Sequence, residues 1–537
     1  MKRILFIAAF VALAGIAVLL AIGGGTGTGT PVALSIVSGS ENRSLEPLIQ
    51  DWAKAHGAEV TVTYLGSVDI SHEIARGKDS TFDGVWPANS LWIQLGDDGR
   101  VVKDAQSILR SPVVLGLRLS IAQKLGWVGR DDVTVQDIAA AAEAGSFRLA
   151  MTSATQSNSG ASAYLGFLYA LAGNPDVLTL DTLNDPALQD AMRTLLAQVN
   201  RSSGSSGWLK DALVAHPEAY DAMFNYESTV LEANQALTAA GAEPLYIVYP
   251  ANGLAMSDSP LGFIDHGDAA KSKAFHDLQT MLLTPETQAR IEALGRRTGL
   301  LAAGGTGDPQ VWRKDWGADY AKTFSPIPMP SAEVIRAALN LYQSELRKPS
   351  LTIWVLDTSG SMDGEPLQKL KTAMDLLLDK KVAEANLLQP SSRDVTIIIP
   401  FNSAPDQPFQ IVGNADADLG RALAMVNSLQ AGGGTDIYAA LRVALQQIQT
   451  YADDGTLRNY LPAIVAMTDG ASDQANQQAF YDDLAKRSFG RDVPIHAISF
   501  GDADMEQLKT LTNTAIGRIF DSGGDLATAM RDAKGYN

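Results

Sequence analysis

Three oxygen-bearing side chains stand at alternating positions in the segment Asp357-Thr358-Ser359-Gly360-Ser361. The segment directly follows the apolar run 351–356, LTIWVL, which has the length and composition of a buried strand. In an open α/β sheet, ligands bind beyond the carboxyl ends of the strands. A carboxylate and two hydroxyls at such a position could bind a hard cation, or they could form a turn in which Asp and Ser cap a helix.

Two further oxygen-rich segments favour the cation. The segment 432–436, GGGTD, precedes a helical pattern that starts near Ile437, and Thr468-Asp469-Gly470 follows the apolar run 463–467. Neither segment contains histidine or cysteine, the ligands that softer metals prefer. Mg²⁺ prefers oxygen ligands at about 2.0–2.1 Å and keeps several waters, so one or two carboxylates suffice. The sequence therefore predicts a Mg²⁺ site, with Ca²⁺ or Mn²⁺ as alternatives, that leaves one coordination position open.

The elements around these segments alternate between strand and helix. Apolar strand candidates are 351–356, 395–401, 463–467 and 493–500. Helical faces repeat through Leu367, Leu370, Met374 and Leu377, and again from Ile437 to Ile448. Apolar strands that alternate with helices predict a doubly wound, mostly parallel sheet covered on both faces. The predicted domain extends over residues 349–537, directly after a helical stretch 333–345.

Together, Asp357-x-Ser359-x-Ser361, the later Thr435 and Asp469 resemble the metal-ion-dependent adhesion site of a von Willebrand factor type A domain. The resemblance extends from about Pro349 to the C-terminus. It implies a Rossmann-like fold in which Ser359, Ser361 and Thr435 contact the metal directly. Asp357 and Asp469 would act through bound waters. It also implies a protein partner that donates a carboxylate to the open metal position.

An α/β pattern also begins near the N-terminus. The apolar run 32–37 is followed by Ser38-Gly39-Ser40, a helical stretch and the strand candidate 60–65. Further strand candidates are 113–117, 147–151 and 245–248, and helical stretches are 161–172, 228–239 and 269–282. Hydroxyls and backbone N–H groups at helix N-termini can bind an anion without Lys or Arg. Ser40, Ser67, Ser157 and Ser159 are candidates for such a site, although each could equally be a helix cap or turn residue.

Residues 32–348 are similar to an extracytoplasmic solute-binding protein of the two-lobed, periplasmic-binding type. The segments that carry this resemblance are 38–40 (SGS), 66–67 (GS), 86–90 (WPANS), 155–160 (TQSNSG), 225–228 (NYES), 249–250 (YP) and 259–262 (SPLG). The resemblance implies a small oxyanion or polar solute bound between two lobes, and adds Asn89 and Glu227 to the candidate ligand residues. For Glu227, a contact between lobes and a structural hydrogen bond remain equal alternatives.

The N-terminal segment predicts export. Ile4–Ile22 is a run of uncharged, mostly apolar residues behind Lys2 and Arg3. Nineteen helical residues rise about 28 Å, close to a bilayer core of about 30 Å, and the positive charges should stay cytoplasmic. A signal peptide cleaved near Ala21-Ile22-Gly23 is the alternative, and would give a secreted protein. Residues 1–31 thus form an anchor or signal and a Gly/Thr spacer, and both interpretations place the remainder outside the cytoplasmic membrane.

Composition excludes several other functions. The net charge is -18 and no basic block follows the first residues, so binding to nucleic acid is not expected. The chain has no cysteine, which removes disulfides, thiolate metal sites and cysteine nucleophiles. Its 6 histidines form no paired metal spacing, and no G-x-S-x-G elbow follows a strand. We therefore expect a binding protein rather than an enzyme.

These patterns lead to two hypotheses about function. The first is a membrane-anchored extracytoplasmic protein that binds a protein partner through a divalent cation. The alternative is a receptor for a small oxyanion or polar solute that is linked to a transporter or envelope complex. Both share one predicted α/β architecture, a two-lobed domain followed by a type A domain.

Overall fold

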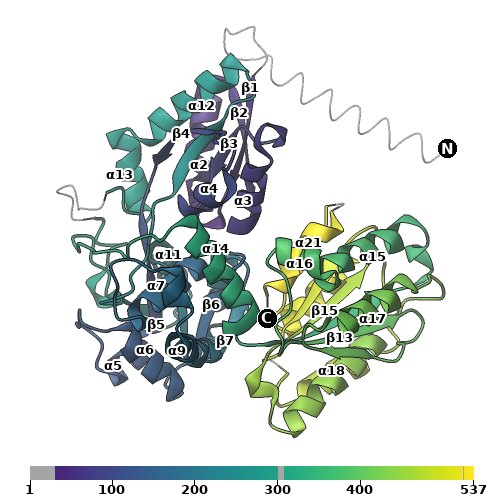
Figure 1. Ribbon diagram of the computed structural model, residues 1–537. Coiled ribbons are helices and arrows are strands. Elements are labelled where there is room, and N and C mark those ends of the chain that lie inside the picture. The colour runs from purple at the N-terminus through teal and green to yellow at the C-terminus, as the bar shows by residue number, and fades with distance from the viewer. Residues whose placement is uncertain (1–30, 300–306, 491, 524, 537) are drawn as a thin grey trace.

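The structure is a computed structural model, and it describes residues 31–299, 307–490, 492–523 and 525–536. Figure 1 shows two stacked lobes, purple to teal, and a third α/β body, green to yellow, beside them. The predicted membrane segment Ile4–Ile22 lies outside the described residues. Within the described ranges, none of the helices combines the length and apolar character that crossing a bilayer requires.

The first lobe surrounds a five-stranded mixed sheet with the strand order β2-β1-β3-β11-β4. Its strands are β1 Val32–Ser38, β2 Ala58–Tyr64, β3 Gly84–Trp86, β4 Val102–Ser107 and β11 Pro260–Ile264. Its helices are α2 Glu46–His56, α3 Ser67–Ala75, α4 Leu91–Gly96, α12 Ala269–Leu282 and α13 Pro285–Ala293. Strand β1 is parallel to β2 and β3, whereas β11 is antiparallel to both of its neighbours. Lobe 1 is therefore completed by a strand that follows the strands of lobe 2 in the sequence.

The second lobe surrounds a six-stranded sheet with the order β10-β5-β8-β6-β7, and β9 pairs with β5. Its strands are β5 Ser111–Arg118, β6 Leu149–Thr152, β7 Val199–Ser203, β8 Ala222–Tyr226, β9 Leu245–Val248 and β10 Met256–Ser257. Its helices are α5 Leu119–Lys124, α6 Val135–Glu143, α7 Asn158–Leu171, α8 Leu180–Leu183, α9 Pro186–Ala197, α10 Ser206–Ala215, α11 Glu227–Ala239 and α14 Ala332–Leu341. The apolar face of α14 packs into the core of this lobe through Ile335 and Leu339.

The third body is a doubly wound domain with the strand order β14-β13-β12-β15-β16-β17. Its strands are β12 Ser350–Asp357, β13 Val395–Phe401, β14 Phe409–Val412, β15 Leu461–Thr468, β16 Ile495–Ser499 and β17 Ile519–Asp521. Its helices are α15 Glu365–Leu378, α16 Lys380–Ala385, α17 Asp416–Asn427, α18 Ile437–Asp453, α19 Gln477–Lys486, α20 Met505–Thr514 and α21 Leu526–Lys534. All pairs are parallel except β13 with β14. This confirms the predicted mostly parallel sheet.

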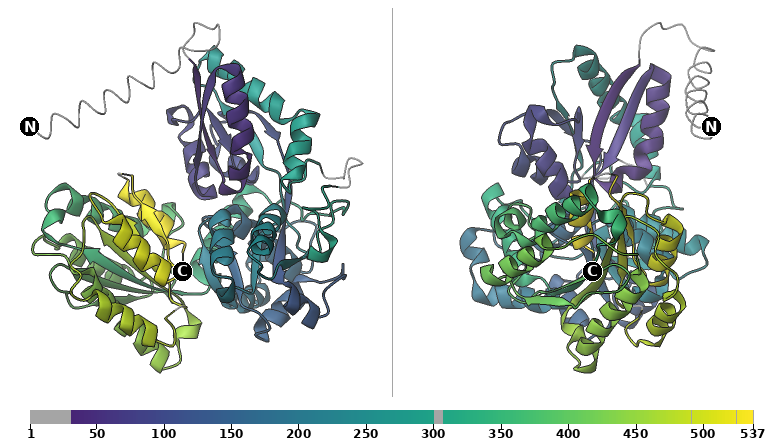
Figure 2. Two further views of the ribbon diagram at one scale, coloured as in Figure 1. Left: turned by 180° about the vertical axis from the view of Figure 1, so that it is seen from behind. Right: turned by 90° about the vertical axis from the view of Figure 1, so that its right-hand side faces the viewer.

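The side chains of β12 alternate between two cores, as the period of a strand requires. Trp354 and Leu356 pack with residues of α15, α17 and α21 on one face. Ile353 and Val355 pack with residues of α18 and α19 on the other. Figure 2 shows these helices on both sides of the sheet. A strand buried on both faces is continuously apolar, which explains why this strand was readily predicted.

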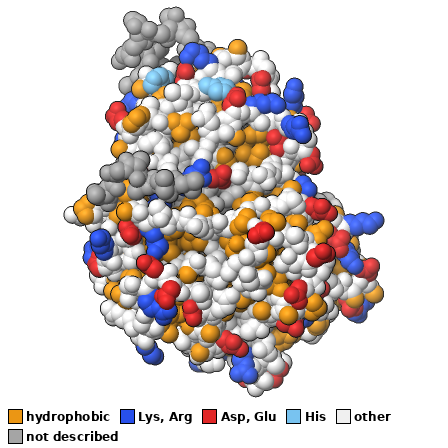
Figure 3. All heavy atoms as spheres, turned by 60° about the vertical axis from the view of Figure 1, so that its left-hand side comes forward, with side chains coloured by type: hydrophobic (Ala, Val, Ile, Leu, Met, Phe, Trp, Pro, Cys, Tyr) orange, Lys and Arg blue, Asp and Glu red, His pale blue; other side chains and the backbone are white. Residues whose placement is uncertain are grey.

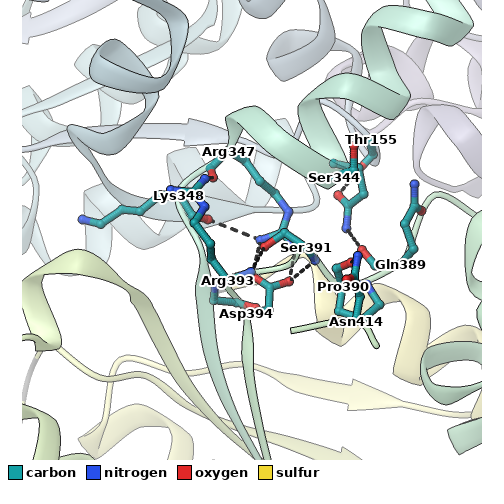
Figure 4. Close-up of polar contacts among 12 residues, drawn as sticks. Thr155, Ser344, Arg347, Lys348, Gln389, Pro390, Ser391, Arg393, Asp394 and Asn414 are labelled. Atoms are coloured by element: carbon teal, nitrogen blue, oxygen red, sulfur yellow. Dashed lines mark hydrogen bonds and ion pairs between the residues drawn. The ribbon is translucent and has the colours of Figure 1, made fainter. Parts of the chain in front are cut away.

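A hydrogen-bonded joint connects the second lobe to the third body. After α14 the chain makes a π-helical turn, Tyr342–Leu346, and β12 begins at Ser350. The Arg347 guanidinium forms a fork with the buried Asp394 carboxylate, with Nη1 3.0 Å from Oδ1. Asp394 also accepts hydrogen bonds from the backbone N–H groups of Ser350, at 2.8 Å, and Ser391, at 2.9 Å. Figure 4 shows how these groups close around the start of β12.

Candidate functional sites

Four of the five predicted metal residues lie at the carboxyl ends of two adjacent strands, β12 and β15. Asp357 ends β12 and is fully buried, and its Oδ1 accepts a hydrogen bond of 2.8 Å from the backbone N–H of Ser359. The Ser359 and Ser361 hydroxyl oxygens are 3.1 Å apart. The Ser361 hydroxyl donates to Asp469 Oδ1 at 2.7 Å. These four side chains, Asp357, Ser359, Ser361 and Asp469, therefore form one group of oxygens.

The glycine-rich loop packs directly against this group through its backbone. Gly432 N–H donates to Thr358 O at 2.9 Å, and Gly360 N–H donates to Gly433 O at 3.0 Å. Gly433 has φ +84°, a conformation that glycine adopts without strain. Thr435 lies in this loop, and its carbonyl oxygen accepts hydrogen bonds from the Asp473 N–H and the Ser472 hydroxyl. Among the described residues, its hydroxyl takes no part in the hydrogen bonds that join the other four predicted ligands.

The electrostatics of this group suit a divalent cation. Burial raises the pKa of Asp357, and the nearby Asp469 raises it further, while hydrogen bonds from Thr468 and Ser359 oppose the shift. In the described part of the chain, no group of three or more His, Cys, Asp or Glu side chains is placed to hold a metal ion. The candidate site instead combines two carboxylates with hydroxyls, a donor set typical of a hard cation. The donors present thus fit Mg²⁺, although their role as ligands stays a prediction.

A second candidate site lies in the cleft between the two lobes, which contact each other closely. Ser67 N–H of lobe 1 donates to Gln156 O of lobe 2 at 2.9 Å. Asn158 N–H donates back to the Ser67 hydroxyl at 2.9 Å, and Trp92 Nε1 donates to Asn158 Oδ1 at 2.8 Å. The hydroxyls of Ser40 and Ser205 are 3.0 Å apart across the cleft. The lobes are therefore closed on one another.

A cavity of about 100 Å³ remains within this closed cleft. Ser40, Ser67 and Ser157 line it, as three of the predicted ligand residues. Helices α3, α7 and α10 begin at Ser67, Asn158 and Ser206 respectively, so three helix N-termini meet near the cavity. Helix N-termini carry partial positive charge, which favours a negative group at this end.

The structure places the other three predicted ligand residues outside the cavity wall. Ser159 is fully buried below it, with its hydroxyl 2.7 Å from Thr152 Oγ1 and 2.8 Å from Ser206 Oγ. Asn89 holds a turn by accepting from Leu91 N–H and donating to Met256 O. These contacts are structural, because neither side chain faces the space between the lobes.

Glu227 belongs to a buried ion pair that sequence patterns did not reveal. Its Oε2 lies 2.7 Å from Arg297 Nε and its Oε1 lies 2.9 Å from Arg297 Nη2. Tyr249 donates a further hydrogen bond to the same carboxylate. This geometry corresponds to the structural alternative for Glu227. Arg297 was missed because no local spacing relates it to position 227.

The last helix of the third body, α21, also lines the cleft cavity. Arg531 on α21 forms an ion pair with Asp69 of lobe 1, with Nε 3.0 Å from Oδ1. Gln156 of lobe 2 donates from Nε2 to the Arg531 carbonyl oxygen at 2.8 Å. The Tyr536 ring meets the Trp208 ring edge to face, with centroids 4.7 Å apart.

Sequence patterns gave no indication that α21 would reach the cleft. Its contact residues are Arg531 and Asp532, which look like the solvated face of an amphipathic helix. The segment 203–207, SGSSG, could have been recognised as part of the cleft, because it mixes serine and glycine as the segment 38–40 does. Contacts between distant segments follow from tertiary packing, so local spacing cannot predict them.

Comparisons with known proteins agree with this division of the chain. The sequence profile of the bacterial extracellular solute-binding protein family matches residues 34–297. The profile of the von Willebrand factor type A domain matches residues 353–524. Among curated proteins, no significant match to the chain is found.

Solved structures with similar folds include representatives of both parts. A von Willebrand factor type A protein from Catenulispora acidiphila is 15% identical, covers 35% of this chain and 42% of that chain, and has a TM-score of 0.29. The sulfate-binding protein SubI from Mycobacterium tuberculosis H37Rv is 17% identical, covers 56% and 93%, and has a TM-score of 0.39. The periplasmic molybdate-binding protein of Azotobacter vinelandii is 17% identical, covers 49% and 98%, and has a TM-score of 0.34. The chain thus joins an N-terminal domain of the bacterial extracellular solute-binding protein family to a C-terminal von Willebrand factor type A domain.

Proposed function

We propose that the protein is an extracytoplasmic binding protein whose type A domain uses a divalent cation to bind an acidic side chain of a protein partner. The observation that carries this proposal is the joined group of oxygens at the ends of β12 and β15. Asp357, Ser359, Ser361 and Asp469 come from segments far apart in sequence, yet they are linked by contacts of 2.7 to 3.1 Å. A turn that served only as a helix cap would not need the Asp469 carboxylate from a second strand.

The chemistry of the group supports an open metal shell rather than a closed cage. Ser359, Ser361 and Thr435 would supply neutral oxygens, and Asp357 and Asp469 would balance the charge through bound water. A bound Mg²⁺ would supply a Lewis-acidic centre that attracts a carboxylate. Ser359 is buried whereas Ser361 is exposed, so the group reaches the surface on the Ser361 side. A carboxylate of a partner could approach from that side.

A metal-dependent capture experiment tests this function. The full chain would be immobilised and exposed to detergent-solubilised envelope proteins in Mg²⁺ or in EDTA. We expect a partner that is retained with Mg²⁺, released by EDTA, and lost in the Asp357→Ala variant. The matched control is Asp482→Ala, because Asp482 is an exposed carboxylate on α19 of the same domain. Retention that is equal in Mg²⁺ and EDTA, or equal in wild type and Asp357→Ala, would contradict the proposal.

The cleft cavity favours a second function, the binding of a small polar solute or oxyanion. Its supporting observation is the cavity of about 100 Å³ between two closed lobes, whose lining includes serine hydroxyls and helix N-termini. If the protein were also linked to a transporter or an envelope complex, it would act as a receptor for that solute. Calorimetry of the full chain against sulfate, molybdate and neutral polyols tests it. Solute binding that is unchanged in Asp357→Ala would show that the two sites act independently.

The family of the N-terminal domain supports an extracytoplasmic location, with the N-terminal segment as anchor or cleaved signal. Nucleic acid is not among the proposed partners. Figure 3 shows Lys and Arg side chains interspersed with Asp and Glu over the face that it draws. Such a mixed surface offers no concentrated basic patch on that face to a phosphate backbone. We propose no catalytic residue, because both recognised domains are of kinds that bind.

A further inference from the structure

The cavity between the lobes and α21 is lined by three carboxyl groups and three arginines, and only Asp69 and Arg531 among them form an ion pair. Glu41 and Asp69 of lobe 1 and Asp532 of α21 line it together with Arg43, Arg518 and Arg531. The arginines already have other partners. Arg531 pairs with Asp69, Arg518 donates to the Tyr536 hydroxyl, and Arg43 stacks on the Tyr64 ring at 4.1 Å from its centroid. Glu41 and Asp532 form no ion pair with these three arginines, although Arg531 and Arg518 act on Asp532 from a longer distance.

Both carboxyl groups are partly buried, and the nearby arginines offset only part of the cost of burying their charge. Glu41 Oε1 is buried and has no hydrogen-bond partner among the described residues. Burial raises the pKa of Glu41 to about 7, although Arg296 lowers it. Burial also raises the pKa of Asp532 to about 7, and Asp69 raises it further, whereas Arg531 and Arg518 lower it. A positive group inside the cavity would stabilise both carboxylates.

Other groups that line the same cavity have the reverse character. The N-terminus of α3 begins at Ser67, and Ser157 and Ser205 are the N-cap residues of α7 and α10. Their hydroxyls and the partial positive charge of the helix ends favour an anionic group. A doubly charged oxyanion would suit these groups but would be repelled by Glu41 and Asp532, which are not in an ion pair with the arginines of the cavity. A ligand with one positive and one negative group suits a lining that contains both kinds of group.

We propose that the cavity binds a small zwitterion that carries an ammonium group and a carboxylate, and that α21 of the type A domain contributes directly to this site through Asp532. The ammonium group would pair with the Glu41 and Asp532 carboxylates, and the carboxylate would accept hydrogen bonds at the helix N-termini and their serines. The inference rests on the proposed solute-binding function of the cleft. It narrows the solute class, and it makes the site a joint product of both domains.

Binding of simple probes to the full chain tests this proposal. Isothermal calorimetry at pH 8, where both carboxyl groups are ionised, would compare L-alanine and γ-aminobutyrate with propionate, propylammonium and sulfate. We expect at least one of the two zwitterions to bind, and to bind at least about tenfold more tightly than each singly charged probe and sulfate, a difference of about 1.4 kcal/mol. A preference for sulfate or propionate would overturn the assignment of a zwitterionic ligand, but it would leave the proposed solute-binding function intact. Binding of none of the five probes would overturn both.

Variants separate the role of α21 from that of the lobes. Asp532→Asn should lower the affinity for the zwitterion by about tenfold or more. The Mg²⁺ affinity of this variant should stay unchanged, and that measurement also reports that the type A domain is folded. Glu41→Gln should have a comparable effect from the other domain. The matched control Asp482→Asn removes an exposed carboxylate of the type A domain and should leave zwitterion affinity unchanged. Equal affinities of wild type, Asp532→Asn and Glu41→Gln would contradict the proposed site.

Discussion

The Ser361 hydroxyl donates a hydrogen bond of 2.7 Å to the Asp469 carboxylate, and this contact connects the ends of β12 and β15. The two strands are direct neighbours in the sheet. Their carboxyl ends therefore project the Ser361 turn and the Asp469 loop toward the same point. The contact turns separate sequence motifs into one candidate binding surface.

Loss of one hydroxyl should weaken metal binding without unfolding the domain. Ser359→Ala or Thr435→Ala removes one neutral oxygen donor and no packed apolar group, so we expect Mg²⁺ affinity to fall by about tenfold or more. Calorimetric titration of Mg²⁺ into the metal-stripped full chain measures the effect. Ser403→Ala is a useful control, since its hydroxyl accepts from Gly434 N–H and supports the loop only indirectly. Unchanged Mg²⁺ affinity in both variants would refute the ligand assignment.

Removal of the metal should lower the stability of the protein. A ligand that binds only the folded state stabilises it by RT ln(1 + [L]/Kd), which is about 2.7 kcal/mol at a hundredfold excess over Kd. We therefore expect EDTA to lower the melting temperature of the wild type and Mg²⁺ to restore it. In Asp357→Ala the two melting temperatures should coincide. A wild-type melting temperature that is insensitive to EDTA would count against the site.

The joint between the domains should depend strongly on Asp394. Burial alone would raise the pKa of this carboxyl group, but Arg347 and the backbone hydrogen bonds hold it at about 2. Asp394→Ala leaves the Arg347 charge buried without its partner, which typically costs about 3–5 kcal/mol. Chemical denaturation measures the change. Asp416→Ala is the matched control, because its ion pair with Lys380 is exposed and should contribute about 0–1 kcal/mol.

Docking of α21 on the cleft should depend on the absence of a side chain at Gly535. A Cβ at this position would lie 1.3 Å from Gln156 Oε1, so the Gln156 side chain would have to move and would lose its hydrogen bond to Arg531 O. We expect Gly535→Ala and Gln156→Ala each to cost about 1 kcal/mol, and the double variant to cost little more than either. Gly420→Ala on α17 is the control, because no atom lies within 4 Å of its Cβ position. Additive costs would show that the two residues do not interact.

The pH dependence of stability should carry the signature of Asp532. Its carboxyl group has a pKa of about 7 in the folded protein and an ordinary value of 3.8, so the folded state binds more protons between these values. Stability contributed by this group is therefore present at low pH and is lost as pH rises from about 4 to about 7. Asp532→Asn should melt at the same temperature as wild type near pH 4 and at a higher temperature near pH 8. The opposite trend would mean that Arg531 and Arg518 lower the pKa of Asp532 by more than burial, Asp69 and Asp525 raise it.

Local patterns predicted the elements that depend on local chemistry. Strands β12, β13, β15 and β16 were recognised because burial on both faces makes them continuously apolar. Edge strands β14 and β17 were missed, since β17 has only three residues and β14 has a half-exposed face. Among the site residues, the serines and aspartates after strands could be found from their types and positions. Asp532 could not, because its role depends on where α21 docks.

The position of β11 has a consequence for how the protein is made. The sheets of lobe 2 and of the type A body are each assembled from one continuous stretch of chain, whereas the sheet of lobe 1 has a gap between β3 and β4 until Pro260–Ile264 has been synthesised. Until then, two strand edges of lobe 1 are unpaired, and unpaired edges can associate with other chains. The sheet of lobe 2 should therefore form first on the growing polypeptide. The risk of aggregation during synthesis is thus concentrated in lobe 1, and it ends when β11, a strand only five residues long, pairs with β3 and β4.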